Sequence, residues 1–235
     1  MRGLLLFLLV FPCISFGQDV DLSDNQNIYR YHNQIWLRGK LVLPLNKKTE
    51  FSTQYISRIY FDGSAPGNFF YLSGQHQFKK WLIADFTGRL VMDQGYNLYR
   101  LEVGAKVRKE IFKDFKIAYR TAAFREVKTY AFSRELSKAP YFFWRNRIEV
   151  SWQPKKKWEF GTSFEVWNLF NYRYNGKLDK ACVIVDAEYK LTKHQSFTVA
   201  YQNQFDIQRV KKVDLNMYCI GYIYTLKKLK KKAHS

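Results

Sequence analysis

The chain is organised around segments in which apolar and polar side chains alternate with a period of two. In residues 96–108, for example, the apolar Leu101 and Val103 alternate with the charged Arg100 and Glu102. Successive side chains of a strand point to opposite faces, so this pattern predicts strands with one apolar and one charged face. The same alternation occurs in residues 141–153 and 181–191.

Eleven such segments are found, and most of them are a dozen residues or so in length. Strands of soluble proteins usually have about 5 or 6 residues, whereas a tilted strand needs about 9 to 11 residues to cross a bilayer. The lengths therefore favour a membrane barrel over a secreted β-sandwich. The predicted segments are approximately 28–43, 49–61, 69–78, 81–92, 96–111, 115–126, 141–153, 158–170, 180–191, 195–208 and 213–226.

The connections between these segments alternate between short and mostly longer. Short turns joined to longer loops are typical of an up-and-down outer-membrane barrel, in which the turns face the periplasm and the loops face outward. The short connections are residues 44–48, 79–80, 112–114, 154–157 and 192–194, and the others are 62–68, 92–95, 127–140, 171–179 and 209–212. The predicted fold is therefore an all-β, antiparallel up-and-down transmembrane β-barrel.

The strand count is the open point of this prediction. Bacterial single-chain barrels have even numbers of strands, with both termini in the periplasm. A further short strand within residues 19–27, where Val20 and Leu22 alternate with polar residues, would make twelve strands. If instead one of the eleven segments is not a strand, the number is ten. We expect about twelve strands, with ten as the alternative.

Aromatic residues gather where the predicted strands end. Amphipathic rings settle at the headgroup level of a bilayer, so two clusters of this kind predict two interfacial belts. The alternative is that these rings belong to the core of a soluble sheet. The residues are Phe78, Trp81, Phe112, Phe115, Trp152 and Trp158 beside the short turns, and Phe69, Phe70, Tyr96, Phe142, Phe143, Phe170 and Tyr172 beside the longer loops.

The N-terminus has the features of a secretory signal peptide. Arg2 precedes an apolar stretch from Leu4 to Phe11, and small residues around Gly17 form a cleavage site. We expect cleavage after Gly17, a barrel in residues 18–226 and a basic, disordered tail in residues 227–235. The later chain contains no run of 18 apolar residues, although 47% of all residues are hydrophobic, which excludes a membrane helix.

Charged residues of the predicted strands should point into the barrel. Buried charges require partners, so one interpretation is a ladder of cross-strand ion pairs that fills the interior. The other is a basic constriction that binds or passes anions, because arginines outnumber acids in this set. The candidate lumen residues are Arg58, Asp85, Arg89, Arg100, Glu102, Arg120, Glu126, Arg145, Arg147, Glu149 and Glu165.

The residues that an enzyme of the lipid face would need are scarce. Acyl transfer or hydrolysis requires a nucleophile close to a base, and only His32 and His76 lie in strands, each without a serine two residues away. We therefore expect no catalytic residue, cofactor or metal site. Cys182 and Cys219 are not in a metal-binding spacing, and one strand separates them, so we expect free thiols.

The positive charge is best explained by the membrane. Removal of residues 1–17 takes away one basic and no acidic residue, which lowers the net charge from +19 to +18. Export argues against a nucleic-acid partner, although a basic chain would otherwise suit one. We expect Lys47, Lys48, residues 155–157 and the tail to contact the phosphates of lipid headgroups. The expected lipid partners of the protein are those of the outer membrane, lipopolysaccharide among them. The barrel-assembly machinery is the other expected partner.

Several features spread over nearly the whole mature chain occur together in one family. They are Trp36, Arg58, the alternating segment 96–108, the run Arg145-Asn146-Arg147-Ile148-Glu149 and the closing Gly221-Tyr222-Ile223-Tyr224. With them the chain resembles the uncharacterised bacterial outer-membrane β-barrel family called domain of unknown function 2490. The resemblance implies location and fold, since that family has no agreed activity. One departure is the basic run 227–232, where such barrels often end on an aromatic residue that the assembly machinery recognises.

The sequence thus predicts an outer-membrane barrel of unassigned activity. It is expected to be structural or to pass small solutes, anions among them. The alternative is a lipid-modifying barrel enzyme, an acyl hydrolase or transferase.

Overall fold

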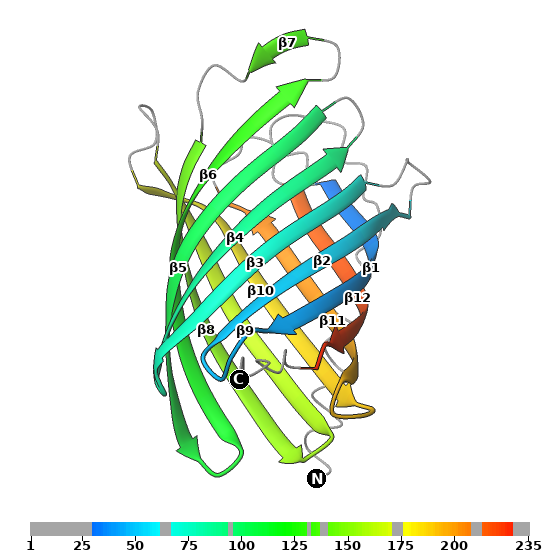
Figure 1. Cartoon of the computed structure of the whole chain (residues 1–235). Coiled ribbons are helices and arrows are strands. Elements are labelled where there is room, and N and C mark those ends of the chain that lie inside the picture. The colour runs from blue at the N-terminus through cyan, green and yellow to red at the C-terminus, as the bar shows by residue number, and fades with distance from the viewer. Residues whose placement is uncertain are drawn as a thin grey trace, which may run out of the picture.

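A closed β-barrel makes up the computed structural model of the protein (Figure 1). The structure describes residues 30–61, 67–93, 96–130, 133–136, 141–170, 176–207 and 213–227. The predicted signal peptide, the possible strand within residues 19–27 and tail residues 228–235 lie outside these ranges. In the part of the chain that is described, no helix is long and apolar enough to cross a membrane.

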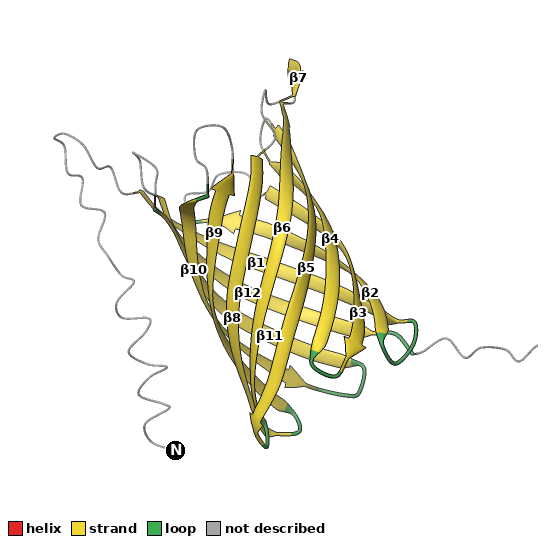
Figure 2. Cartoon of the chain, turned by 90° about the vertical axis from the view of Figure 1, so that its left-hand side faces the viewer, coloured by secondary structure: helices red, strands yellow, loops and turns green. Residues whose placement is uncertain are grey.

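Twelve strands are assigned within the described ranges, and all but one of them form the barrel wall. The exception is the four-residue β7, which pairs only with the end of β6 above the rim (Figure 2). The strands are β1 (Arg30–Pro44), β2 (Thr49–Tyr60), β3 (Gly67–Lys79), β4 (Leu82–Asp93), β5 (Tyr96–Phe112), β6 (Phe115–Tyr130), β7 (Ser133–Leu136), β8 (Tyr141–Lys155), β9 (Trp158–Phe170), β10 (Lys177–Lys190), β11 (Gln195–Asp206) and β12 (Val213–Thr225).

The eleven predicted segments correspond to the eleven wall strands of the described chain, with small shifts at their ends. The largest difference is at β6, which continues to Tyr130 into the region expected to be a loop. Each wall strand pairs with its sequence neighbour in antiparallel register, except at the seam between β1 and β12. The expected up-and-down barrel is confirmed, and β7 is the twelfth strand of the sheet.

The seam between the first and last wall strands is parallel. Its register runs from Arg30 beside Val213 to Val42 beside Thr225. Both strands run from the end of the barrel that carries β7, called here the loop end, to the opposite turn end (Figure 1). The parallel seam follows from the odd number of wall strands, because strands that alternate in direction leave the first and the last pointing the same way. The sheet therefore closes even though the number of wall strands in the described chain is odd.

Apolar side chains form the outer surface of the wall. Leu101 is 74% exposed, for example, whereas the adjacent Arg100 is only 6% exposed. Soluble proteins rarely expose a continuous apolar surface of this kind, but a lipid-facing band requires it. Large exposed residues of this band include Leu37, Leu41, Leu72, Phe86, Leu101, Val103, Val107, Ile148, Phe164, Val199 and Ile220.

The aromatic belts are only partly as expected. Phe78, Trp81 and Phe112 are exposed at the turn end, and Phe70 and Phe142 are exposed at the loop end. Phe69 and Phe143, however, are buried inside the barrel, so their assignment to the loop-end belt was wrong. The reason is the period of two: adjacent rings in one strand must point to opposite faces. The side chains of Tyr96 and Tyr172 lie outside the described part.

The turn end is stabilised by short, locally bonded connections. The Asn46 side chain accepts hydrogen bonds from the backbone N–H groups of Lys48, at 2.7 Å, and Thr49, at 2.8 Å. Asp114 adopts a left-handed backbone with φ of 70°, a conformation that aspartate tolerates better than most residues. These turns return the chain to the wall within a few residues.

Cys182 and Cys219, the two cysteines of the described residues, are buried and unbridged, as expected. Cys182 pairs in register with Gln204 of β11, whereas Cys219 pairs with Ala200. The two residues are therefore separated by the width of β11 and by four residues along it. This offset adds to the strand spacing that already prevents a disulfide.

The parallel seam predicts which engineered cysteines will react. In a background without native thiols, we expect Leu37→Cys with Ile220→Cys to form a disulfide, because these positions are register partners on the outer face. Paired backbones about 4.8 Å apart satisfy disulfide geometry. Leu41→Cys with Tyr224→Cys should react as well. Mass spectrometry after alkylation measures both products.

The matched control combines Leu41→Cys with Asn216→Cys. In the parallel seam these positions are far apart, since Leu41 pairs with Tyr224. An antiparallel seam that kept Leu37 beside Ile220 would bring them together instead. Reaction of this control pair would contradict the parallel closure.

Candidate functional site

All eleven predicted lumen residues lie on the inner face of the wall. They come from β2, β4, β5, β6, β8 and β9, at alternate positions from the exposed apolar side chains. The antiparallel register places Arg100 beside Glu126 and Arg147 beside Glu165. Sequence alternation was sufficient to place these side chains.

Near the loop end, Glu126 binds two arginines. It accepts hydrogen bonds from Arg100 and from Arg89, the latter at 3.2 Å. The Arg100 guanidinium also stacks on aromatic rings, with its Cζ atom 4.0 Å from the centroid of Phe124 and 4.9 Å from that of Trp167. Stacking holds the face of the guanidinium and leaves its N–H edges to bind anions.

At mid-height, Glu102 joins two further arginines. It accepts a hydrogen bond from Arg120 at 2.6 Å and another from Arg145. Arg120 also donates to Asp85, with its Nε atom at 3.1 Å from the carboxylate. Only 4% of the Glu102 side chain is exposed, so these ion pairs are shielded from solvent and depend on their geometry.

Towards the turn end, the charges become more accessible. Glu149 pairs with Lys106 and with Arg147, and Arg147 also approaches Glu165 at 3.8 Å. Lys106 and Arg147 are each 28% exposed, the highest values among these paired cations. Lys106 was not among the predicted residues, although its position in the same alternating segment as Arg100 and Glu102 marks it as inward-facing.

The ion pairs lie along the wall and do not cross the lumen. The pairs named above lie within one strand, as Arg147 and Glu149 of β8 do, or join strands that are adjacent or have one strand between them. Where Arg120 reaches Asp85 over β5, the inward residue beneath the pair is small: a Cβ at Gly104 would lie 3.0 Å from the Arg120 Nη2 atom and 3.1 Å from the Asp85 Oδ1 atom. Ala118 and Ala122 are also buried on this face of β6. The predicted ladder exists, but it lines one wall.

Arg58 has a different setting from the ladder arginines. Its Cζ atom lies 4.5 Å from the ring centroid of Tyr60 and 5.1 Å from that of Phe69. The Arg89 guanidinium approaches the same Phe69 ring, at 5.9 Å. Arg58 and Arg89 therefore lie on either side of β3, both in contact with one aromatic ring.

Two apolar clusters accompany the charges near the loop end, and the sequence prediction missed them. One contains Ile56, Phe69 and Val91, and the other contains Phe124, Phe143 and Trp167; Trp36, Tyr71, Leu98 and Leu169 pack against them. Their inward position follows from the alternation, because Phe124 and Glu126 share one face of β6. The prediction from the sequence instead places the large aromatic residues beside the loops at the membrane interface.

The histidines do not form a catalytic arrangement in the described part of the chain. His76 Nδ1 lies 2.8 Å from the Thr49 hydroxyl on the outer face, and the His76 ring packs edge-on against Phe78. A catalytic base is normally oriented by a third group, and no such partner is bonded to His76 among the described residues. The side chain of His32 lies outside the described part. The described residues also contain no cluster of His, Cys, Asp and Glu that could hold a metal.

Comparison with known proteins identifies the type of barrel. No family model and no curated protein matches the chain. Among solved structures, the NanC porin aligns with a TM-score of 0.53 and 14% identity, covering 82% of this chain and 98% of that one. The protein thus has the fold of a bacterial outer-membrane β-barrel, which points to that membrane as its location.

Two other outer-membrane proteins align less closely. The KdgM porin has a TM-score of 0.48 at 13% identity, with 80% of this chain and 90% of that chain covered. A bacterial polysaccharide outer membrane secretin has a TM-score of 0.49 at 9% identity, with coverages of 75% and 74%.

The buried position of Glu102 predicts a large stability effect. Glu102→Gln removes the charge that Arg120 and Arg145 share and leaves buried cations without it. We expect the free energy of unfolding to fall by about 3 to 5 kcal/mol. Urea unfolding of the protein in lipid vesicles, followed by tryptophan fluorescence, measures the change.

The control is Glu159→Gln. Glu159 pairs with Lys190 at 3.1 Å, but both side chains are about one-third exposed. Loss of such a pair should cost about 1 kcal/mol or less. Equal effects of the two substitutions would show that burial of Glu102 does not determine its contribution.

Proposed function

We propose that this protein is an outer-membrane channel for small anionic solutes. The observation that carries the proposal is the ladder along the wall from β4 to β9, which leaves the rest of the lumen unbridged by its pairs. The ladder contains more cations than acids: Arg89, Arg100, Lys106, Arg120, Arg145 and Arg147 face Asp85, Glu102, Glu126, Glu149 and Glu165.

Unused hydrogen-bond donors support this proposal. The Nε–H groups of Arg89, Arg145 and Arg147 are buried, and none has a hydrogen-bond acceptor among the described residues. Buried N–H groups are almost always hydrogen-bonded, to water if not to protein. A carboxylate or phosphate entering the lumen would meet guanidinium groups that ion pairs through the other nitrogens already hold in place, and Arg147, 28% exposed, is the most accessible of the three.

The facing wall suits the same function. At mid-height, the inward residues of β10, β11 and β12 include the neutral Cys182, Gln202 and Met217, and the inward carboxylates of β10, Asp186 and Glu188, lie farther toward the turn end. At this height an anion would meet the cations of the ladder on one side and neutral side chains on the other. A lumen with charged groups on one wall gives selectivity by charge and still allows release.

The route to the membrane is part of the proposal. We infer that residues 1–17 are removed after Gly17, as the apolar stretch and small residues indicate. The turn end would then face the periplasm, and the barrel-assembly machinery would insert the chain. Membership of the family called domain of unknown function 2490 also remains a proposal, and it rests on the features of the sequence.

Ion selectivity tests the proposed channel. We expect the purified protein to conduct in planar bilayers and to prefer chloride over potassium. The double variant Lys106→Gln, Arg147→Gln should lower the anion-to-cation permeability ratio several-fold, because these are the most exposed cations of the ladder. Reversal potentials in a potassium chloride gradient measure the ratio.

Arg125→Gln serves as the matched control. Arg125 belongs to β6 as Arg120 does, but it occupies an outward position beside Leu101 and Phe142. Its replacement should leave the permeability ratio unchanged. The absence of conductance in the wild-type protein would overturn the proposal, as would a cation preference.

A further inference from the structure

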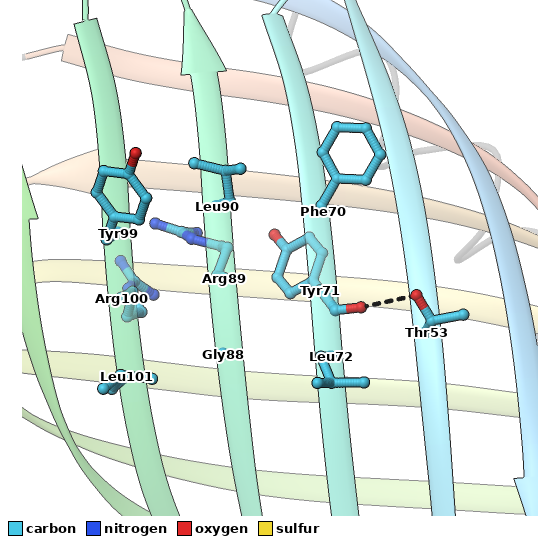
Figure 3. Close-up of a pocket in the computed structure, with 10 residues that line it drawn as sticks. All are labelled: Thr53, Phe70, Tyr71, Leu72, Gly88, Arg89, Leu90, Tyr99, Arg100 and Leu101. Carbon is cyan, nitrogen blue, oxygen red and sulfur yellow. Dashed lines mark hydrogen bonds between the residues drawn. The ribbon is translucent and has the colours of Figure 1, made fainter.

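A groove interrupts the apolar band on the outer face of the wall. It has a volume of about 470 Å³ and lies over β2 to β5 (Figure 3). Gly88 lies in the middle of it, with Leu72 and Leu101 as its register partners on the two adjacent strands. Figure 3 shows Phe70, Leu90 and Tyr99 toward the loop end, where the Tyr99 hydroxyl points.

The groove is not filled by the protein. A Cβ atom at Gly88 would meet nothing closer than Leu101 Cδ2, at 3.8 Å. Gly74, also on the outer face, is different: the rings of Phe51 and Phe86 cover it and pack edge-to-face at 6.0 Å. At position 74, the packing of the two rings requires a glycine. At position 88, the glycine instead leaves a space that is open to the membrane.

An arginine lies in the same row of the outer face. Across the wall, Gly88 pairs with Leu101, Leu101 with Arg125, and Arg125 with Phe142. Arg125 is exposed, and its side chain has no carboxylate partner among the described residues. Because the strands are tilted, the row rises towards the loop end, where Phe142 is one residue from the start of β8. Arg125 is thus at the level of the loop-end belt.

A charged side chain on a lipid-facing surface is unfavourable unless it reaches the interface and finds a counter-charge. At the interface, the anions available are lipid phosphates. Register neighbours on adjacent strands are about 4.8 Å apart, so Arg125 lies about 10 Å from Gly88 across Leu101. That distance suits one amphiphile whose headgroup and acyl chain bind at the two positions.

We propose that this surface is a binding site for one phosphorylated lipid of the outer leaflet, namely the lipid A part of lipopolysaccharide. A phosphate binds Arg125, one acyl chain occupies the groove over Gly88 between Leu72 and Leu101, and the Tyr99 hydroxyl lies at the rim to contact the headgroup. The inference does not depend on the proposed channel, because it concerns only the outer face.

Native mass spectrometry of the purified protein in a neutral detergent tests the site. We expect one lipid A to bind with preference over lipid A from which the phosphates have been removed. Arg125→Gln should weaken the binding of lipid A about tenfold, as loss of a charged hydrogen bond implies, and Arg125→Lys should restore most of it. Gly88→Leu should weaken both lipids, since it fills the groove.

The control for groove filling is Ala84→Leu. Ala84 is on the same outer face of β4, four residues from Gly88, and pairs with Ala105. This variant should bind lipid A as the wild-type protein does. Equal binding of phosphorylated and dephosphorylated lipid A would overturn the proposal, as would wild-type binding by Arg125→Gln or by Gly88→Leu. The conductance of these variants, measured in parallel, separates this outcome from failure of the channel.

Discussion

Backbone hydrogen bonding in lipid is the constraint on which this structure depends. Because the bilayer interior offers no water, an open sheet edge would leave a row of N–H and C=O groups without partners. With eleven wall strands in the described chain, an all-antiparallel arrangement would leave β1 and β12 unable to close the ring. The sheet closes by pairing them in parallel along nearly their whole length. Parallel pairing is slightly weaker for each residue than antiparallel pairing, but it leaves no edge.

Closure then determines what the interior contains. Each strand presents alternate residues to the lumen, and many of these are charged in strands β4 to β9. Charges so close together would repel or lose solvation unless each found an opposite charge. The wall satisfies them locally, and Gly104, Ala118 and Ala122 provide the room for guanidinium groups to pass over a strand. Small residues in β5 and β6 therefore keep this ladder along the wall.

The same alternation has a second consequence at the outer face. The side chains on that face need only be apolar. They can therefore differ in size, because fluid lipid covers them. Gly88 and Arg125 depart from that rule in one row, and neither departure serves packing within the barrel. A lipid bound from the membrane explains this combined apolar and cationic surface, whereas packing within the barrel does not. The two faces of the wall thus carry separate chemistry.

The alternation along the chain was sufficient to predict the strands, their faces and the inward position of all eleven predicted charges, because a period of two is a local property of the chain. It could also have shown that Phe143 faces inward, since it shares a face with Arg145. Three features could be found only in the folded barrel: the seam is parallel, Glu102 joins Arg120 to Arg145, and the ladder lies along one wall. These features depend on how the strands are staggered around a closed ring, which no single segment encodes.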